Sequence, residues 1–222
     1  MNDADLRQAL IDTCLKMNLS GLNQGTSGNL SVRHGNGFLI TPSGIVYDQL
    51  APEDIVYVEM DGRWCHPLAP SSEWRIHRDI LMTKPGVNAV VHAHPPYCTV
   101  LAICHKPIPA IHYMIAITGG DSIPCAPYAT YGTEDLSRHA VAALQERTAC
   151  LLANHGMIAT GENLERAMWR AVEVETLARQ YFHTLLIGGP TILPADEIAR
   201  VIDKFAGYGP KAKPLKDGPG RP

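Results

Sequence analysis

The segment Val90-Val91-His92-Ala93-His94 is the pattern in this 222-residue chain that most clearly suggests chemistry. A β-strand places residues i and i+2 on the same face, so a strand here would aim two imidazoles at one point. Neutral imidazole is a preferred ligand of divalent transition metals, and catalytic sites with an open position usually take three protein ligands. The pair therefore indicates a metal site, although ten histidines also allow such spacing by coincidence.

Two further residues could complete such a site. His155 follows an apolar run and precedes Gly156, so it would lie where a buried strand ends and the backbone turns. Glu73 begins an amphipathic run after Pro70-Ser71-Ser72, and its carboxylate would lie in the first turn of a helix. A carboxylate there could equally have no role beyond a favourable interaction with the positive end of the helix dipole. The candidate ligands are thus His92, His94, His155 and Glu73. Six of the seven other histidines are expected to be solvated or packing residues: His34, His66, His77, His105, His139 and His183.

Three small turns rich in hydroxyl groups suggest anion binding. They are residues 25–29 (GTSGN), 41–44 (TPSG) and 70–72 (PSS). Backbone N–H groups in such turns, and at a helix N-terminus, hold a phosphate without lysine. Taken alone, each turn is better explained by turn chemistry. Because the third turn adjoins Glu73, a phosphate there would lie within one small substrate's length of the metal.

Hydrophobic periodicity predicts a mixture of helices and short strands in one domain. Helices are expected over 5–17, 73–84 with a serine cap, 98–104, 133–146, 163–186 and 196–205. Strands are expected over 30–32, 38–40, 55–58, 87–94 and 150–154, with an extended piece within 107–117. The domain is expected to span residues 1–208, followed by a flexible tail over 209–222 that has little to bury.

Composition excludes several classes of protein. Hydrophobic residues make up 45% of the chain and its net charge is −3, which is typical of a globular protein without affinity for nucleic acid or anionic lipid. No apolar run approaches the roughly 18 residues of a membrane span, and the N-terminus has no signal-peptide pattern. Six scattered cysteines without a CxxC pair are expected to be reduced thiols in the cytoplasm.

Seven segments, in this order and spacing, resemble class II aldolases of the L-fuculose-phosphate aldolase type, within the superfamily that also holds ribulose-phosphate epimerases. They are GTSGNLSVR, ITPSG, PSSEWRIH, VVHAHPPYCTVLA, PAIHYMIA, CAPYATYGT and ANHGMIATG. The similarity runs from about residue 12 to residue 208. Seven motifs in register are far more specific than a lone HxH pair.

The resemblance implies roles for particular residues. His92, His94 and His155 would bind Zn²⁺, or Mn²⁺ or Co²⁺ in its place, with Glu73 as a fourth ligand that also shuttles a proton. Tyr113 would exchange the other proton from a neighbouring subunit. The substrate phosphate would lie among Gly28, Asn29, Ser43, Gly44, Ser71 and Ser72, and the aldehyde end near Tyr131 and Tyr208.

The implied reaction is that of a lyase: reversible cleavage of a ketose 1-phosphate into dihydroxyacetone phosphate and an aldehyde. The metal would act as a Lewis acid toward the charge that carbon–carbon cleavage leaves. The resemblance also implies a homotetramer with active sites at subunit interfaces. It further implies a single α/β domain with a mostly antiparallel central sheet and helices on both faces.

The substrate stays open at this point. L-Fuculose 1-phosphate is the first candidate, and 5-methylthioribulose or 5-deoxyribulose 1-phosphate, substrates of nucleoside salvage, are the alternative. Methylthioribulose-phosphate dehydratases and pentulose-phosphate 4-epimerases share the scaffold, but the epimerases carry aspartate at the position of Glu73, and neither matches PAIHYMIA as closely. A non-catalytic binding module is disfavoured because every ligand position is filled. The tail after Tyr208 departs from the fuculose-aldolase pattern, which leaves open how the C-terminus covers the aldehyde.

Overall fold

A seven-stranded sheet forms the centre of the protein, in a computed structural model that describes residues 2–206. Its strand order is β3-β2-β1-β4-β9-β8-β7, and all neighbours are antiparallel except the parallel pair β7 and β8. The strands are β1 (Asn29–His34), β2 (Gly37–Ile40), β3 (Val56–Glu59), β4 (Ala89–Ala93), β7 (Cys125–Ala126), β8 (Ala149–Leu152) and β9 (Gly156–Gly161). The prediction of a mostly antiparallel sheet is confirmed.

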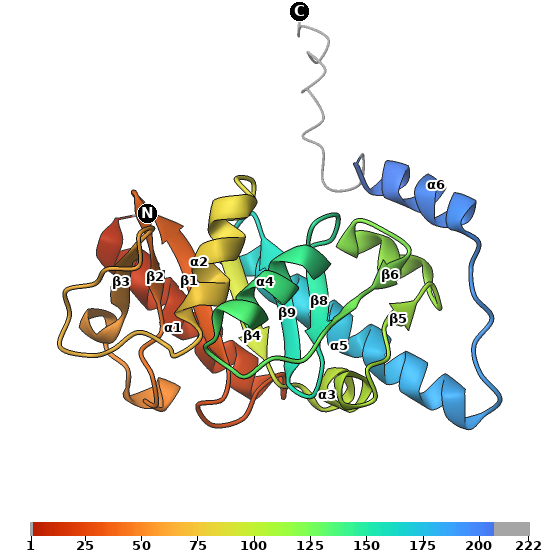
Figure 1. Ribbon diagram of the computed structural model, residues 1–222, viewed down its shortest axis with the longest axis horizontal. Coiled ribbons are helices and arrows are strands. Elements are labelled where there is room, and N and C mark those ends of the chain that lie inside the picture. Colours follow the sequence, from red (N-terminus) through yellow and green to blue (C-terminus); the bar gives the residue numbers. More distant parts are fainter. Residues whose placement is uncertain (1, 207–222) are drawn as a thin grey trace, which may run out of the picture.

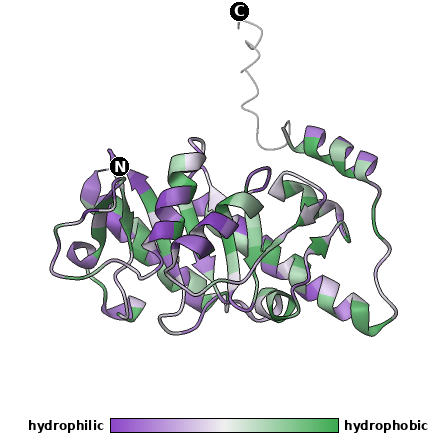
Figure 2. Ribbon diagram, viewed as in Figure 1, coloured by the Kyte–Doolittle hydropathy of each residue, from purple (hydrophilic) through white to green (hydrophobic). Residues whose placement is uncertain are grey.

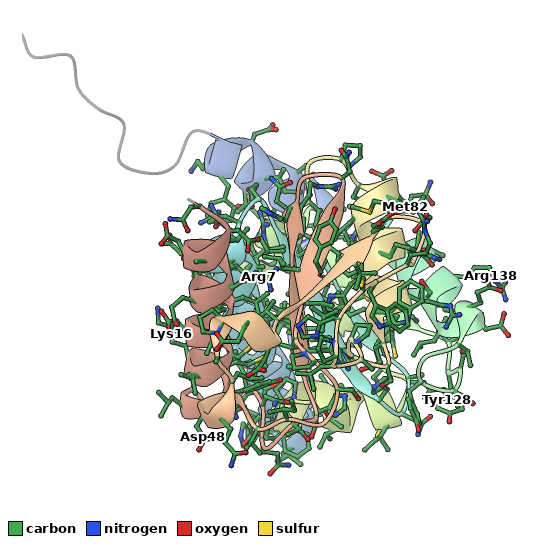
Figure 3. All side chains as sticks on the ribbon, turned by 90° about the vertical axis from the view of Figure 1, so that its left-hand side faces the viewer. Arg7, Lys16, Asp48, Met82, Tyr128 and Arg138 are labelled. Carbon is green, nitrogen blue, oxygen red and sulfur yellow. The ribbon has the colours of Figure 1, made fainter. Side chains whose placement is uncertain are left out.

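Helices cover both faces of this sheet, as predicted. One face packs against α1 (Asp3–Leu19), α3 (Pro96–Ile103) and α5 (Leu164–Leu186), and the other against α2 (Trp74–Thr83) and α4 (Glu134–Ala143). Figure 3 shows this layering, with Arg7 and Lys16 of α1 on the opposite side of the molecule from Arg138 of α4. Two separate apolar cores result, one on each face of the sheet.

Strand alternation decides which side chains reach which face. In β4, Val91 belongs to the core under α1 and α5, while Val90 belongs to the core under α2 and α4. His92 therefore faces α2 together with Val90. In β1, Leu30 packs on the α1 side, so Asn29 and Ser31 also face α2.

The other elements lie at the edges of the sandwich. Strands β5 (Ile108–Pro109) and β6 (Ser122–Ile123) form a second, two-stranded sheet, and short 3₁₀ helices are η1 (Tyr47–Gln49), η2 (Pro52–Asp54) and η3 (Tyr113–Thr118). Helix α6 (Ala195–Ala206) follows a long connection and lies apart from the main sheet, where it contacts η3 (Figure 1). Helix α6 is amphipathic, whereas the central strands are mostly apolar (Figure 2). Among the described residues, no helix is long and apolar enough to cross a membrane.

Several details differ from the sequence-based expectation, which also lacked the short strands β6 and β7 and the 3₁₀ helix η3. The strand β9 was not predicted, because residues 156–161 mix Gly and Thr with apolar residues and lack alternation. The serine cap of α2 was wrong: the N-cap is Glu73, which makes no side-chain cap and has a non-helical backbone (φ −100°, ψ 14°). Its carboxylate is directed away from the helix terminus, and Ser71 Oγ instead accepts the Glu73 N–H at 3.3 Å. Tyr208 and the predicted tail over 209–222 lie outside the described residues.

Packing of α2 on the sheet gives a first prediction. Ile80 is fully buried in the α2–α4 core, whereas Met82 on the same helix is 58% exposed (Figure 3). Ile80→Ala should lower the free energy of unfolding by about 2–5 kcal/mol because it leaves a cavity. Met82→Ala should change it by less than about 0.5 kcal/mol. Urea unfolding measures both, and equal effects would show that α2 is not held by this core.

Candidate active site

Three structural elements bring the four candidate ligands together. His92 is on β4 and His94 follows its end, His155 lies in the turn between β8 and β9, and Glu73 precedes α2. One nitrogen from each histidine lies within 4.8 Å of the others, and each pair of rings has its centroids 4.8 Å apart. The predicted cluster of His92, His94 and His155 is therefore present as a compact group.

The separations within this group suit a metal ion. His92 Nε2 lies 2.9 Å from His94 Nε2 and 3.1 Å from Glu73 Oε2, and His155 Nε2 lies 3.3 Å from Glu73 Oε1. Ligand atoms about 2.0–2.1 Å from a tetrahedral zinc are about 3.3 Å apart. Two imidazole nitrogens and a carboxylate that face one another repel unless a proton or a cation lies between them. The arrangement thus has room and charge for a divalent metal.

Hydrogen bonding fixes which nitrogen His92 offers. Its Nδ1 lies 3.0 Å from the carbonyl oxygen of Met157, which can only accept, so Nδ1 carries the proton. The lone pair of a neutral His92 is then on Nε2, directed toward His94 and Glu73. A backbone carbonyl that holds the far nitrogen of a ligating histidine is the usual support of such a ligand.

Burial and charge act in opposite directions on Glu73 and His92. Burial disfavours the Glu73 carboxylate, but the charge and hydrogen bond of His92, the charge of His155 and a hydrogen bond from Asn29 together hold its pKa well below the usual range. Burial likewise disfavours the His92 imidazolium, yet the Glu73 carboxylate and the Met157 carbonyl raise the pKa of His92 above its usual value. The site is therefore built to hold a carboxylate anion beside a positive charge.

The other two histidines are kept neutral. Burial first, and then the positive charge of His92 and His155, lower the pKa of His94 to about 3. Burial and the charge of His92 lower the pKa of His155 to about 4. Neutral imidazole is the form that binds a metal, so both residues offer lone pairs at ordinary pH.

Glycines allow the backbone to pass close to the histidine strand. A Cβ at Gly156 would lie 2.5 Å from the Ala93 carbonyl oxygen and 2.6 Å from Cδ2 of the His94 ring. A Cβ at Gly28 would lie 2.7 Å from the His92 carbonyl oxygen. Only glycine fits at these two positions without a shift of β4 or its ligands.

The ligands open into a pocket of about 350 Å³. Its lining combines two of the histidines with Glu73, two serines and two tyrosines: Ser27, Ser72, Glu73, His94, Tyr128, Ala129, Tyr131, Asn154 and His155. Tyr128 and Tyr131 are 57% and 66% exposed, and Tyr128 lies at the outer edge of the molecule beside α4 (Figure 3). The pocket therefore has a polar floor and an aromatic rim.

The hydroxyl-rich turns are adjacent to this pocket. An isolated bridge pairs Pro42 with Pro70, Ser71 N donates to Thr41 O at 2.9 Å, and Ser43 N donates to Ala69 O at 3.1 Å. Turns 41–44 and 70–72 thus lie side by side, with Gly44 in the left-handed region at φ +75°. Ser27 brings the first turn to the same pocket, opposite Ser72.

Several predicted site residues do not line this pocket. Tyr113 is 49% exposed on η3, where its ring stacks 6.4 Å from that of Phe205. The Asn29 side chain is buried and donates to Glu73 Oε2 at 3.0 Å. Gly28, Ser43, Gly44 and Ser71 are not among the lining residues either, and Tyr208 lies outside the described residues.

Sequence reasoning assigned no individual role to four of the lining residues. Ser27, Tyr128, Ala129 and Asn154 all lie within the quoted motifs, and Ser27 lies in a turn expected to bind an anion, but none of the four was singled out. Asn154 has φ +54°, which asparagine tolerates better than most residues, so the Asn-His-Gly order was a usable signal. His77, expected to be a solvated or packing residue, is fully buried.

Comparison with known proteins gives the family. A family model described as "Class II Aldolase and Adducin N-terminal domain" matches residues 8–182. The chain belongs to this family.

Its relatives share most of their length with it. A "5-methylthioribulose-1-phosphate/5-deoxyribulose-1-phosphate aldolase" of Rhodospirillum rubrum is 56% identical over 208 residues, 94% of each chain. An "L-fuculose phosphate aldolase" of Escherichia coli (strain K12) is 52% identical over 205 residues, 92% of this chain and 95% of that one. A solved "L-fuculose 1-phosphate aldolase" superposes with a TM-score of 0.89 at 40% identity, covering 91% of this chain and 96% of the other. The protein is accordingly a class II aldolase, a lyase.

The close approach at Gly156 gives a second prediction. Gly156→Ala should displace His94 or the Ala93 carbonyl, so the purified protein should bind less than one divalent metal per chain and lose about 1–3 kcal/mol of stability. Gly86→Ala is the matched control, because a Cβ there meets nothing within 4 Å. Metal analysis measures the metal content of each variant, and thermal unfolding measures its stability. Full metal content in Gly156→Ala would contradict the geometry described here.

Proposed function

We propose that the protein is a zinc-dependent aldolase that reversibly cleaves a ketose 1-phosphate into dihydroxyacetone phosphate and an aldehyde. The observation that carries this proposal is the convergence of three imidazoles and one carboxylate at the floor of a pocket that serines border. The serines could then bind a phosphate, and a metal held by the imidazoles could stabilise negative charge, within one small substrate's length of each other.

The residues fit a divalent metal, with His92, His94 and His155 as the ligands and Glu73 as a fourth. Glu73 Oε1 is buried and has no hydrogen-bond partner among the described residues, although it lies 3.3 Å from His155 Nε2. An oxygen left without a donor in this position suits a metal ligand. When bound, the metal supplies Lewis-acid stabilisation of the charge that carbon–carbon cleavage leaves beside the carbonyl. Zinc is proposed for its match to three imidazoles and one exchangeable position, with Mn²⁺ and Co²⁺ as the other ions to test.

Glu73 is proposed as the group that moves a proton at the carbon of the dihydroxyacetone phosphate half. Its carboxylate is ionised, and it lines the pocket although it is only 5% exposed. The donors that hold this carboxylate also keep its pKa low, so it would take a proton only once those interactions loosen. Ser72 and Ser27, at the same pocket, are suited to hold the phosphate together with Gly28, Asn29, Ser43, Gly44 and Ser71.

Tyr113 is proposed to act from a neighbouring subunit of a homotetramer. Within one chain it is half exposed and does not line the pocket, which supports a role across an interface. Its phenol would exchange a proton with the scissile hydroxyl at the aldehyde side, near Tyr131 and Tyr208. We also propose a cytoplasmic location, which the six free cysteines support.

Subunit complementation tests the roles of Tyr113 and Glu73 together. Tyr113→Phe and Glu73→Gln should each lower kcat by at least about 10²-fold, because each removes a proton-transfer group. If Tyr113 acts in trans, mixed oligomers from a denatured and refolded 1:1 mixture should regain about one quarter of the wild-type sites. Each variant refolded alone is the control. A mixture no more active than the separate variants would place both groups in one subunit.

Two classes of substrate are close candidates. We propose L-fuculose 1-phosphate first, and 5-methylthioribulose or 5-deoxyribulose 1-phosphate as the alternative, which relatives of both names support equally. The tyrosines at the rim would contact the aldehyde end, where a hydrophobic pocket separates such substrates by only about 1–3 kcal/mol per methylene-sized change.

Release of dihydroxyacetone phosphate tests the proposed function. The zinc-loaded enzyme should release it from at least one of these three sugar phosphates, and kcat/KM should rank them. Chelator-treated protein should be inactive and should recover on addition of zinc, manganese or cobalt. No release from any of the three, with full metal content, would favour the dehydratase or epimerase reading. Absence of bound metal and of activity would favour a binding module.

A further inference from the structure

One buried imidazole close to the site has no role in the reaction described above. His77 on α2 is fully buried, and both of its nitrogens have partners. Nδ1 lies 2.7 Å from Ser31 Oγ, and Nε2 lies 2.6 Å from Asn29 Oδ1. Asn29 Nδ2 in turn donates to Glu73 Oε2 at 3.0 Å. Four side chains thus form one continuous chain of hydrogen bonds that ends on the carboxylate.

The helix and strand periods bring these side chains together. Glu73 is the N-cap of α2 and His77 lies one turn later, and both side chains meet Asn29 of β1. Asn29 and Ser31 are two residues apart on β1 and point to the face that α2 covers. Asn29 is also the register partner of His92 across β1 and β4. The chain of hydrogen bonds therefore lies next to the proposed metal ligands, between α2 and the central sheet.

The direction of the chain follows from donor and acceptor chemistry. The Glu73 carboxylate only accepts, so Asn29 must turn its N–H toward Glu73 and its oxygen toward His77. That oxygen only accepts, so Nε2 of His77 must carry a proton. Burial lowers the pKa of His77 to about 3, so the ring is neutral and Nδ1 accepts the Ser31 hydroxyl hydrogen. Every donor points toward Glu73.

We propose that His77 is a positioning residue for the reaction: through Asn29 it fixes Oε2 of Glu73, so that Oε1 is directed toward the metal and the substrate. The proposal rests on the proposed role of Glu73 as metal ligand and proton carrier. A carboxylate without this chain could rotate in the pocket, and both its hold on the metal and its aim at the substrate carbon would weaken. Outer residues that orient ligands in this way typically change activity or metal affinity by about 10–100-fold when removed.

Two substitutions of similar size separate positioning from packing. In His77→Gln the amide nitrogen can reach the place of Nε2 and still donate to Asn29. In His77→Asn the shorter amide reaches only the place of Nδ1, next to Ser31, and Asn29 loses its donor. The two variants bury similar polar groups, so a merely structural role predicts similar losses in both.

The measurements are kcat and KM for the proposed sugar phosphates, thermal unfolding, and the visible spectrum of the cobalt(II)-loaded protein. We expect His77→Asn to lower kcat by about 10–100-fold, with KM changed less than about threefold, and to alter the cobalt spectrum in the direction of Glu73→Gln. His77→Gln should restore most of kcat and the wild-type spectrum. Ser31→Ala, the mildest change, should lower kcat several-fold.

Other outcomes would overturn the proposal. Wild-type kcat and spectrum in His77→Asn would leave His77 as a packing residue only. Equal losses of activity and melting temperature in both His77 variants would do the same. If neither variant folds, an unchanged kcat in Ser31→Ala would show that this chain of hydrogen bonds does not position Glu73. If wild-type cobalt protein releases no dihydroxyacetone phosphate, the proposed function fails, and the cobalt spectra still decide the role of His77.

Discussion

The close approach of three imidazoles and one carboxylate at one point is the constraint on which the rest of the structure depends. The Nε2 atoms of His92 and His94 are 2.9 Å apart, and the Glu73 carboxylate oxygens lie 3.1 Å from His92 and 3.3 Å from His155. These groups are mostly shielded from water, so their charges and lone pairs cannot be satisfied by solvent. A rigid frame imposes this arrangement, and a proton or a cation between the groups offsets their repulsion.

The frame is the sheet and its two apolar cores. The central strand β4 is hydrogen-bonded on both sides, by β1 and β9, and each neighbour supplies a glycine where its backbone passes the histidine segment. Helix α2 packs on the same face through Ile76 and Ile80 and thereby fixes Glu73 at its start. Close packing of this kind lets a fold hold groups in an unfavourable arrangement, since the cost is spread over many apolar contacts.

The sequence predicted those parts of the site that follow from a local pattern, such as the two-residue repeat of a β-strand. The i, i+2 spacing of His92 and His94 on a strand, and an apolar run that ends at His155, required no tertiary information. Glu73 was named as a candidate ligand from its place at a predicted helix start, but such a residue can face many directions, so no period predicted that it meets the three histidines.

Other features depend on contacts that no local pattern encodes. Ser71 resembles a helix cap in sequence, yet Glu73 takes the N-cap position because its side chain is held by Asn29 and His92. His77 was expected to be an ordinary helix residue, and only the meeting of α2 with β1 gives it two partners. Tyr128 and Asn154 reach the pocket from loops whose course is set by the sheet.

Glu73 and the three imidazoles are proposed to share one metal, with Glu73 as the ligand that gives way. A crystal structure of the zinc-loaded protein, solved with and without dihydroxyacetone phosphate, would test this directly. We expect one anomalous peak about 2.0–2.1 Å from a nitrogen of each of His92, His94 and His155. Glu73 should coordinate in the free protein and be displaced by the ligand. A metal bound elsewhere, or a Glu73 that keeps its place when the ligand is bound, would show that the proposal is wrong.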